Sequence, residues 1–232
     1  MKRVLFAVLL LAAVLIGAPA TFAQGSGGQT APSQTKPLPS PDSLLALGKV
    51  EGSTYTNQHF GISFTAPKGW TILGVEIMTE VRAKAKDVFR DEKDLKIKRE
   101  LEATVDRTTP LFSASKLPPG TTGSFHAVVI CAAEQIPTAI VKTPHDYYTL
   151  MLQSLKLSQG VNVEVVQPFQ TKRIGTTDFG TYTLKITSNM GIMLQKQMVA
   201  IKAPYAFGIV FTYVEESDAK AFDELISSIK VK

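Results

Sequence analysis

The sequence predicts an α+β fold in which a single central antiparallel β-sheet is flanked by helices. Its strand-like and helix-like segments run in the order strands, helices, strands, helix, strands, helix, which differs from the strict alternation of a parallel α/β fold. The strand-like segments between residues 161 and 213 are joined by connections too short for parallel crossovers. With 44% hydrophobic residues in a chain of 232, there is enough apolar material for one well-buried domain.

The first 23 residues are predicted to form a cleavable secretory signal peptide. Two positive residues, Lys2 and Arg3, precede an apolar run at 4–17 that carries no charge. A proline and several small residues follow, ending at Ala23, and this is the pattern that a signal peptidase reads. Cleavage is therefore expected after Ala23, and the mature protein is expected to be secreted or periplasmic.

Two other interpretations of this segment have different requirements. An uncleaved membrane anchor needs about 20 apolar residues, and residues 4–17 fall short of that length. A lipoprotein needs a cysteine at the cleavage site, whereas the only cysteine in the chain is Cys131. We therefore expect no lipid anchor and no transmembrane segment after cleavage.

Residues 24–42 are predicted to be a disordered linker. They consist mainly of Gly, Ser, Thr, Gln and Pro, and the prolines prevent regular structure while almost nothing apolar is present to bury. The folded domain is expected to span residues 43–232.

The charge of the chain gives little reason to expect a nucleic-acid partner. The formal charge is +5 and the calculated pI is 9.2, but Lys2 and Arg3 leave with the signal peptide, so the 25 basic side chains fall to 23 against 20 acidic ones. No run of like charge suggests a groove for a polyanion. Because the single Cys131 cannot form an internal disulfide, packing and hydrogen bonds must stabilise the domain.

The first strands are indicated by alternation of apolar and small or polar residues. Phe60, Ile62 and Phe64 follow the period of two that is typical of a half-buried strand. Residues 67–69 are expected to form a turn, and Trp70 is expected to anchor the core before a short strand at 71–73.

Residues 76–106 form the longest helix-like segment, and this segment is rich in charge. It has two apolar stripes, one ending at Phe89 and one beginning at Ile97, which are out of phase with the charged residues 91–94 between them. The pattern predicts either one kinked helix or two consecutive helices.

Two further strands, at 109–115 and 125–132, lead to a helix with a strong start signal. Thr143 suits the N-cap, Pro144 suits the first helical position, and Asp146 lies three residues after the cap. The buried face of this helix is expected to consist of Tyr148, Met151, Leu152 and Leu155.

The last part of the chain has the pattern of a strand meander closed by a helix. Strands are expected at 161–166, 171–174, 179–187, 192–202 and 205–213. Ser217 is expected to cap the closing helix, which packs on the sheet through Ala221, Phe222, Leu225, Ile226 and Ile229.

Two of these segments resemble the PsbP-like family. Residues 60–70, FGISFTAPKGW, are similar to its aromatic-Gly-apolar strand followed by Pro-x-x-Trp. Residues 205–211 and 221–229 are similar to its last strand and closing helix, with a Ser before an apolar residue. The resemblance implies an α/β/α sandwich around a central antiparallel sheet, to which 76–106 is an addition, and a non-enzymatic, exported assembly or binding role.

Candidate catalytic residues do not form a recognisable site. Nucleophile elbows, phosphate-binding loops, HExxH and paired CxxC motifs are absent. Ser113 and Lys116 match Ser-x-x-Lys, but the same spacing recurs three more times in the chain. Cys131 lies in an apolar strand and is expected to be a buried small hydrophobe.

The three histidines, His59, His126 and His145, lie far apart and have no ligand-like partner at i+3 or i+4. We therefore predict no catalytic, cofactor-binding or metal-binding residue and no cofactor. The aromatic-rich face of the strand at 205–213 is expected to be core beneath the closing helix, with a ligand-binding groove as the alternative.

These observations predict an exported, non-enzymatic binding or accessory protein that contacts an envelope or extracellular component. Two alternatives are an exported hydrolase or ligand-processing enzyme with a dispersed site, and a membrane-tethered spacer that keeps residues 1–23. A pocket that gathers His126, His145 or acidic side chains of perturbed ionisation would favour the enzyme.

Overall fold

The computed structural model describes residues 48–74, 95–118, 121, 125–155, 161–188 and 191–232. The predicted signal peptide, the linker and the start of the domain at residue 43 lie outside the described residues. So does most of the predicted helical segment 76–106, including the point at which it was expected to kink or divide.

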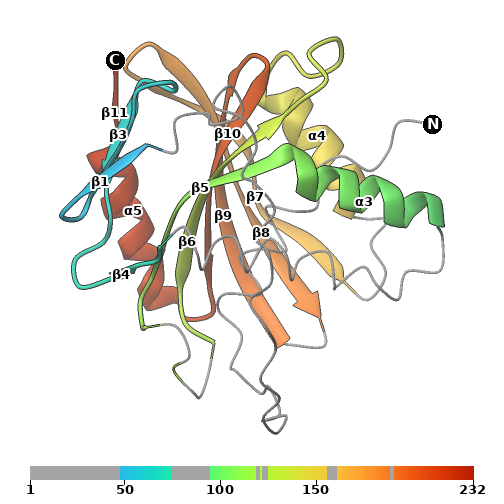
Figure 1. Cartoon of the computed structure of the whole chain (residues 1–232). Coiled ribbons are helices and arrows are strands. Elements are labelled where there is room, and N and C mark those ends of the chain that lie inside the picture. Colours follow the sequence, from blue (N-terminus) through green and yellow to red (C-terminus); the bar gives the residue numbers. More distant parts are fainter. Residues whose placement is uncertain (1–47, 75–94, 119–120, 122–124, 156–160, 189–190) are drawn as a thin grey trace, which may run out of the picture.

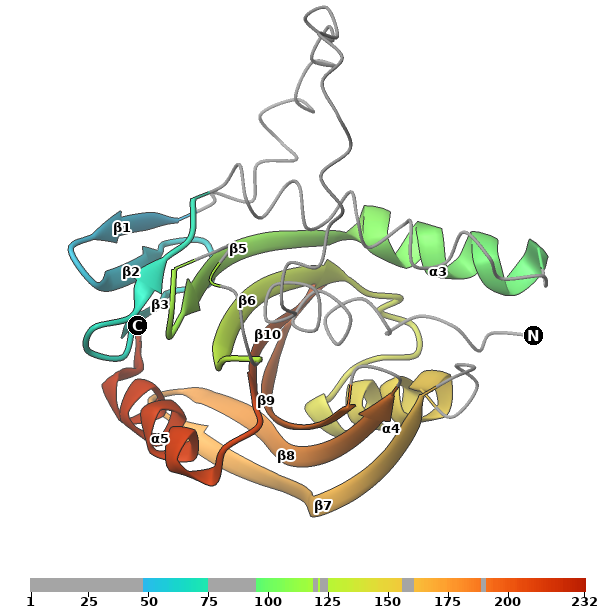
Figure 2. The same cartoon turned by 90° about the horizontal axis from the view of Figure 1, so that it is seen from below.

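One curved sheet of seven strands forms the centre of the described chain (Figures 1 and 2). The strand order is β4-β5-β6-β10-β9-β8-β7, and every neighbouring pair is antiparallel. The strands are β4 (Thr71–Ile72), β5 (Thr108–Ser115), β6 (Val128–Gln135), β7 (Asn162–Ile174), β8 (Thr177–Ser188), β9 (Gly191–Lys202) and β10 (Tyr205–Tyr213).

A second antiparallel sheet of four strands lies beside the first, in the order β1-β2-β3-β11. Its strands are β1 (Lys49–Glu51), β2 (Thr54–Asn57), β3 (Ile62–Thr65) and β11 (Lys230–Val231). The prediction of a single sheet is therefore wrong. The outer strands of the four-stranded sheet have no sequence pattern that could reveal them, because β1 is exposed at all three residues and β11 has only two residues.

The helices lie on both sides of the seven-stranded sheet (Figure 1). They are α3 (Leu95–Arg107), which runs directly into β5, α4 (Pro144–Leu155) and α5 (Ala219–Ser228), with the short 3₁₀ turn η2 (Glu216–Asp218) before α5. Helix α5 and the four-stranded sheet cover one face, and α4 covers part of the other. The expected α/β/α sandwich is met only in part, because a small sheet shares one outer layer with α5.

Alternation along the central strands divides the interior into two apolar clusters. On β10, Phe207, Ile209 and Phe211 point toward α5, whereas Ala206 and Val210 point toward α4. The predicted aromatic face of β10 is therefore core beneath the closing helix, as expected: the Phe211 ring stacks on Phe222 of α5 with 5.2 Å between centroids.

Three details of the predicted elements are corrected. The two strands expected at 161–166 and 171–174 are the single edge strand β7, whose register shifts around Pro168, because an edge strand tolerates a residue without an N–H donor. Ser217 does not cap α5: it lies inside η2, and Asp218 occupies the N-cap position. In α4 the buried aromatic residue is Tyr147, and Tyr148 is half-buried.

Candidate functional site

The three histidines lie on separate elements. His59 lies between β2 and β3, where its ring contacts Phe60 and Tyr205. His126 is buried just before β6, and His145 on α4 contacts the rings of Tyr148 and Phe169. Across the described parts of the chain, no group of three or more His, Cys, Asp or Glu side chains is placed to hold a metal ion.

The Ser-x-x-Lys pair has structural contacts in place of a catalytic geometry. The Ser113 hydroxyl is buried and donates to the backbone oxygen of Val129 at 3.1 Å. The Lys116 ammonium forms an ion pair with Asp218 at 2.6 Å. Cys131 is fully buried, and burial raises the pKa of its thiol well above the ordinary value, so it is the small core residue that the sequence predicts.

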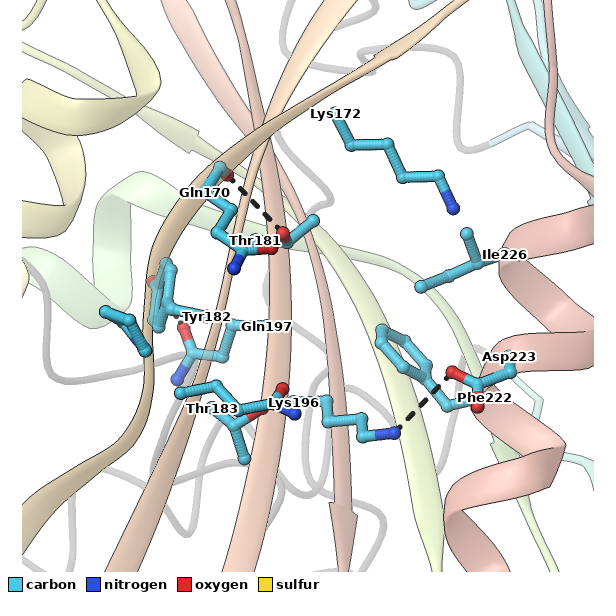
Figure 3. Close-up of a pocket in the computed structure, with 12 residues that line it drawn as sticks. Gln170, Lys172, Thr181, Tyr182, Thr183, Lys196, Gln197, Phe222, Asp223 and Ile226 are labelled. Carbon is cyan, nitrogen blue, oxygen red and sulfur yellow. Dashed lines mark hydrogen bonds and ion pairs between the residues drawn. The ribbon is translucent and has the colours of Figure 1, made fainter.

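A cleft with polar lining lies between α5 and the strands β7, β8 and β9, and we call it the α5 groove (Figure 3). Its volume is about 380 Å³. It is lined by Gln167, Pro168, Gln170 and Lys172 of β7, Thr181, Tyr182 and Thr183 of β8, Lys196 and Gln197 of β9, and Phe222, Asp223 and Ile226 of α5.

Strand alternation places the two threonines and Lys196 on the α5 side of the sheet, whereas Tyr182 belongs to the cluster beneath α4. On β8, Thr181 and Thr183 share the face of the buried Phe179, and on β9 Lys196 shares the face of Met198. Helix α5 covers this face only in part, so the strands near the β7 edge expose hydrogen-bonding groups rather than core residues.

The charges in the α5 groove are unequal. Lys196 forms an ion pair with Asp223 at 3.5 Å, where the lysine side chain is 16% exposed and the aspartate side chain 69%. Lys172 also reaches from β7 toward α5 and ends near Ile226 (Figure 3). Two ammonium groups and one carboxylate therefore line the groove, which leaves one positive charge in excess.

The threonine hydroxyl groups of the groove already donate hydrogen bonds within the protein. Thr183 donates to the side-chain oxygen of Gln167 at 2.6 Å, and Thr181 donates to the backbone oxygen of Gln170 at 3.4 Å. The lining of the groove includes no histidine, and its one carboxylate, Asp223, is paired with Lys196. The arrangement offers hydrogen-bonding and charged groups to a bound molecule.

Outside the groove, Glu134 of β6 is a buried acid with a raised pKa, and it was not among the predicted site residues. Its side chain is 1% exposed, and its Oε2 accepts a hydrogen bond from the Tyr147 hydroxyl at 2.8 Å. Burial raises its pKa to about 8, although the Tyr147 hydrogen bond and the charge of Arg107 lower it. One signal was available: Glu134 follows six apolar residues at 128–133 and continues the same strand.

The perturbed acid and the clefts do not coincide. Glu134 lines neither the α5 groove nor a second cleft of about 260 Å³ near Thr177 and Val231, and neither cleft contains a histidine. The combination that would favour an enzyme is therefore not found in these two clefts. The groove itself escaped prediction because its edge wall is the irregular stretch 167–170, where the sequence pattern of a strand is broken.

None of the helices in the described ranges has the length and apolar character required to cross a membrane.

Comparisons with known proteins give similarities of structure only. The sequence matches no protein-family model and no curated protein. Among solved structures, the chain is similar to cyanobacterial PsbP (CyanoP) from Synechocystis sp. PCC 6803, with 15% identity, 81% of this chain and 99% of that chain covered, and a TM-score of 0.48.

Two further similar structures come from other bacteria. LpqN, involved in cell envelope biogenesis of Mycobacterium tuberculosis, shows 9% identity over 74% of this chain and 83% of its own, with a TM-score of 0.41. PA94 of Pseudomonas aeruginosa, a protein of unknown function, shows 10% identity over 52% and 78%, with a TM-score of 0.40. At these identities and scores the likeness is confined to the course of the chain.

Proposed function

We propose that this chain is an exported, non-enzymatic binding protein that contacts an envelope component through the α5 groove. The observation that carries the proposal is the composition of the groove: hydrogen-bonding side chains of β7 and β8 and the two lysines Lys172 and Lys196 lie beside α5. The threonine hydroxyls there donate hydrogen bonds to Gln167 and Gln170, and the lining includes no histidine.

The shape and charge of the groove suit an extended, acidic segment of a partner protein. From Gln167 to Lys172 the β7 wall runs for roughly 17 Å at about 3.3 Å per residue, which accommodates about five residues of an extended peptide. The amide and hydroxyl side chains match the hydrogen bonds of a peptide backbone. A carboxylate of the partner would meet Lys172 and would compete with Asp223 for Lys196.

Site-specific photocrosslinking in the native envelope tests this proposal. A photoreactive residue at Thr181, inside the groove, is expected to give a discrete adduct, and the same residue at Gln153, on the exposed side of α4, is the matched control. Adding Lys172→Glu to the Thr181 probe is expected to reduce the adduct at least threefold. Equal adducts from both positions, or turnover of a substrate by the purified domain, would contradict the proposal.

Export is the part of the proposal that rests on residues 1–23. The expected mature N-terminus is Gln24, and N-terminal sequencing of the protein from its native host measures it directly. A mature chain that begins at Met1 would instead support a membrane-tethered spacer.

A further inference from the structure

Glu134 lies at the contact between the seven-stranded sheet and α4. On β6 it is paired with Thr108 of β5 and with Ala206 of β10, so strands flank it on both sides. Tyr147 of α4 covers it and donates to its Oε2 at 2.8 Å. Its Oε1 is buried and accepts no hydrogen bond from any described residue.

Three ionisable groups of the described chain face this carboxyl. Arg107, at the end of α3, and the Tyr147 hydroxyl favour its charged form, whereas burial disfavours that form more strongly. Tyr182 of β8 is the third, and burial is the main cause that raises its own pKa. Because the pKa of Glu134 is about 8, the group is mainly protonated at neutral pH and ionises in mildly alkaline solution.

Helix α4 also packs against Phe169 of the edge strand β7. The Phe169 ring lies 5.0 Å from the His145 ring and 5.3 Å from the Tyr148 ring, measured between centroids. Gly180 of β8 makes room for this contact, since a Cβ there would lie 2.8 Å from Cζ of Phe169 and 2.8 Å from Cβ of Pro144. Phe169 is therefore held between the first turn of α4 and β8.

Phe169, which packs against α4, lies in the stretch of β7 that forms a wall of the α5 groove. The β7–β8 register shifts between Val165 and Gln167 and again between Gln167 and Gln170, so Phe169 lies in an irregular stretch. Phe169 packs into the cluster beneath α4, whereas Gln167 and Gln170 line the groove on the other side. A displacement of α4 that released Phe169 would change the position of these two groove residues.

We propose that the protonation of Glu134 controls the α5 groove. The neutral acid keeps α4 packed against the sheet and Phe169 packed against α4, whereas the carboxylate loosens both contacts. Binding of a partner in the groove therefore weakens in alkaline solution. The effect on binding rests on the proposed function of the groove, but the effect on the groove wall does not. The link consists of packed contacts from Glu134 to Tyr147, along α4 to Tyr148, and from there to Phe169.

Hydrogen exchange of the full chain measures the groove wall without any ligand. After correction for the intrinsic exchange rate, protection in α4 and in residues 166–170 is expected to fall about fivefold between pH 8 and pH 9, since the neutral fraction of an acid with a pKa of about 8 falls from about one half to about one eleventh. Glu134→Gln, which cannot ionise, is expected to show no such fall. Tyr147→Phe removes a hydrogen bond that favours the carboxylate and is expected to move the transition to higher pH.

The substitution His145→Gln removes the imidazole that contacts Phe169. Hydrogen exchange repeated in this background separates any effect of His145 on residues 166–170 from the effect of Glu134. An equal fall in protection in the Glu134→Gln variant would overturn the proposal, and so would a fall in α4 without one at 166–170. The Thr181 photocrosslink at pH 7 and pH 9 then tests binding. A pH-dependent groove wall with no adduct at either pH would refute the proposed function and leave the proton control intact.

Discussion

At the scale of single residues, the burial of Glu134 links folding stability to pH. Its pKa rises from an ordinary value of 4.5 to about 8 on folding, so between these values the folded state keeps a proton that the unfolded state releases. The contribution of this proton to the free energy of unfolding is fully present below about pH 4.5 and is lost as the pH rises through 8.

Urea unfolding at pH 5, 7 and 9 is therefore expected to show a loss of stability on the order of a few kcal/mol across this range. Glu134→Gln is expected to flatten this dependence and to be relatively most stabilising at pH 9. The difference between the two profiles isolates Glu134 from other titrating groups. Parallel profiles would show that the carboxyl is already ionised at neutral pH.

Gly180 is the second residue with a specific spatial requirement. Gly180→Ala would place a methyl group against the Phe169 ring and Pro144, and we expect a destabilisation of about 1–3 kcal/mol in urea unfolding. Phe169→Leu shortens the opposing side chain, so the double variant is expected to recover part of the loss. Additive effects of the two substitutions would contradict direct contact.

The chemistry of individual residues could be predicted from the sequence only where a neighbouring pattern defined the environment. Cys131 lies in an unbroken apolar strand, and its burial follows from that strand. Glu134 continues the same strand, but its partner Tyr147 and the nearby Arg107 come from other elements. A sequence read as separate segments contains no information on which charges meet.

At the scale of elements, the start of α4 shows a capping box formed by Thr143 and Asp146. The Asp146 amide donates to Thr143 Oγ1 at 3.1 Å, and the Thr143 amide donates to Asp146 Oδ2 at 2.9 Å. The Lys142 amide also donates to this carboxylate at 3.0 Å, and together these hydrogen bonds lower the pKa of Asp146.

Thr143→Ala is expected to destabilise the protein by about 1 kcal/mol, whereas Thr143→Ser keeps the acceptor oxygen and is expected to stay close to the wild type. Because folding lowers the pKa of Asp146, its stabilisation is present above pH 3.8 and is lost as the pH falls through the lower folded value. Urea unfolding at pH 7 and at pH 3 measures both effects. An equal loss in the Ser and Ala variants would rule out the hydroxyl as the cap.

The elements that the sequence predicts well are those whose signals are local. The cap and proline at 143–144 locate the start of α4, and alternation locates β3 and β10. Strand β7 is divided in the prediction because Pro168 and its neighbours break the pattern, although pairing with β8 continues on both sides. The α5 groove depends on that irregular pairing, which the sequence alone does not reveal.

At the scale of the whole molecule, α5 and β11 join the small sheet to the large one. Strand β11 pairs with β3, and the ring of Phe222 on α5 stacks on Phe211 of β10. The ring of Trp70 also stacks on Phe211, with 5.7 Å between centroids. Trp70 lies where the chain passes from the small sheet to β4. The closing segment predicted from the resemblance is therefore the connection between the two layers.

Ser228 makes one of these connections through its hydroxyl group. Its Oγ accepts from the Thr65 amide of β3 at 2.9 Å and donates to the Leu225 oxygen at 2.6 Å, so one hydroxyl joins α5 to a strand 163 residues away. Ser228→Ala leaves the half-buried Thr65 amide without this acceptor. We expect a loss of about 1–2 kcal/mol in urea unfolding.

Ser227 provides a matched control for this prediction. It is the exposed neighbour in the same helix, and its hydroxyl donates only to the Asp223 oxygen within α5 at 2.8 Å, so Ser227→Ala is expected to change stability by less than about 0.5 kcal/mol. Hydrogen exchange should show faster exchange at Thr65 and in β2 and β3 for Ser228→Ala only, with β6 to β10 unchanged. If both variants lose equal stability, or if Thr65 keeps its protection, α5 does not hold the small sheet through Ser228, and apolar contacts such as Phe60 on Phe207 and Phe64 on Phe112 join the two layers instead.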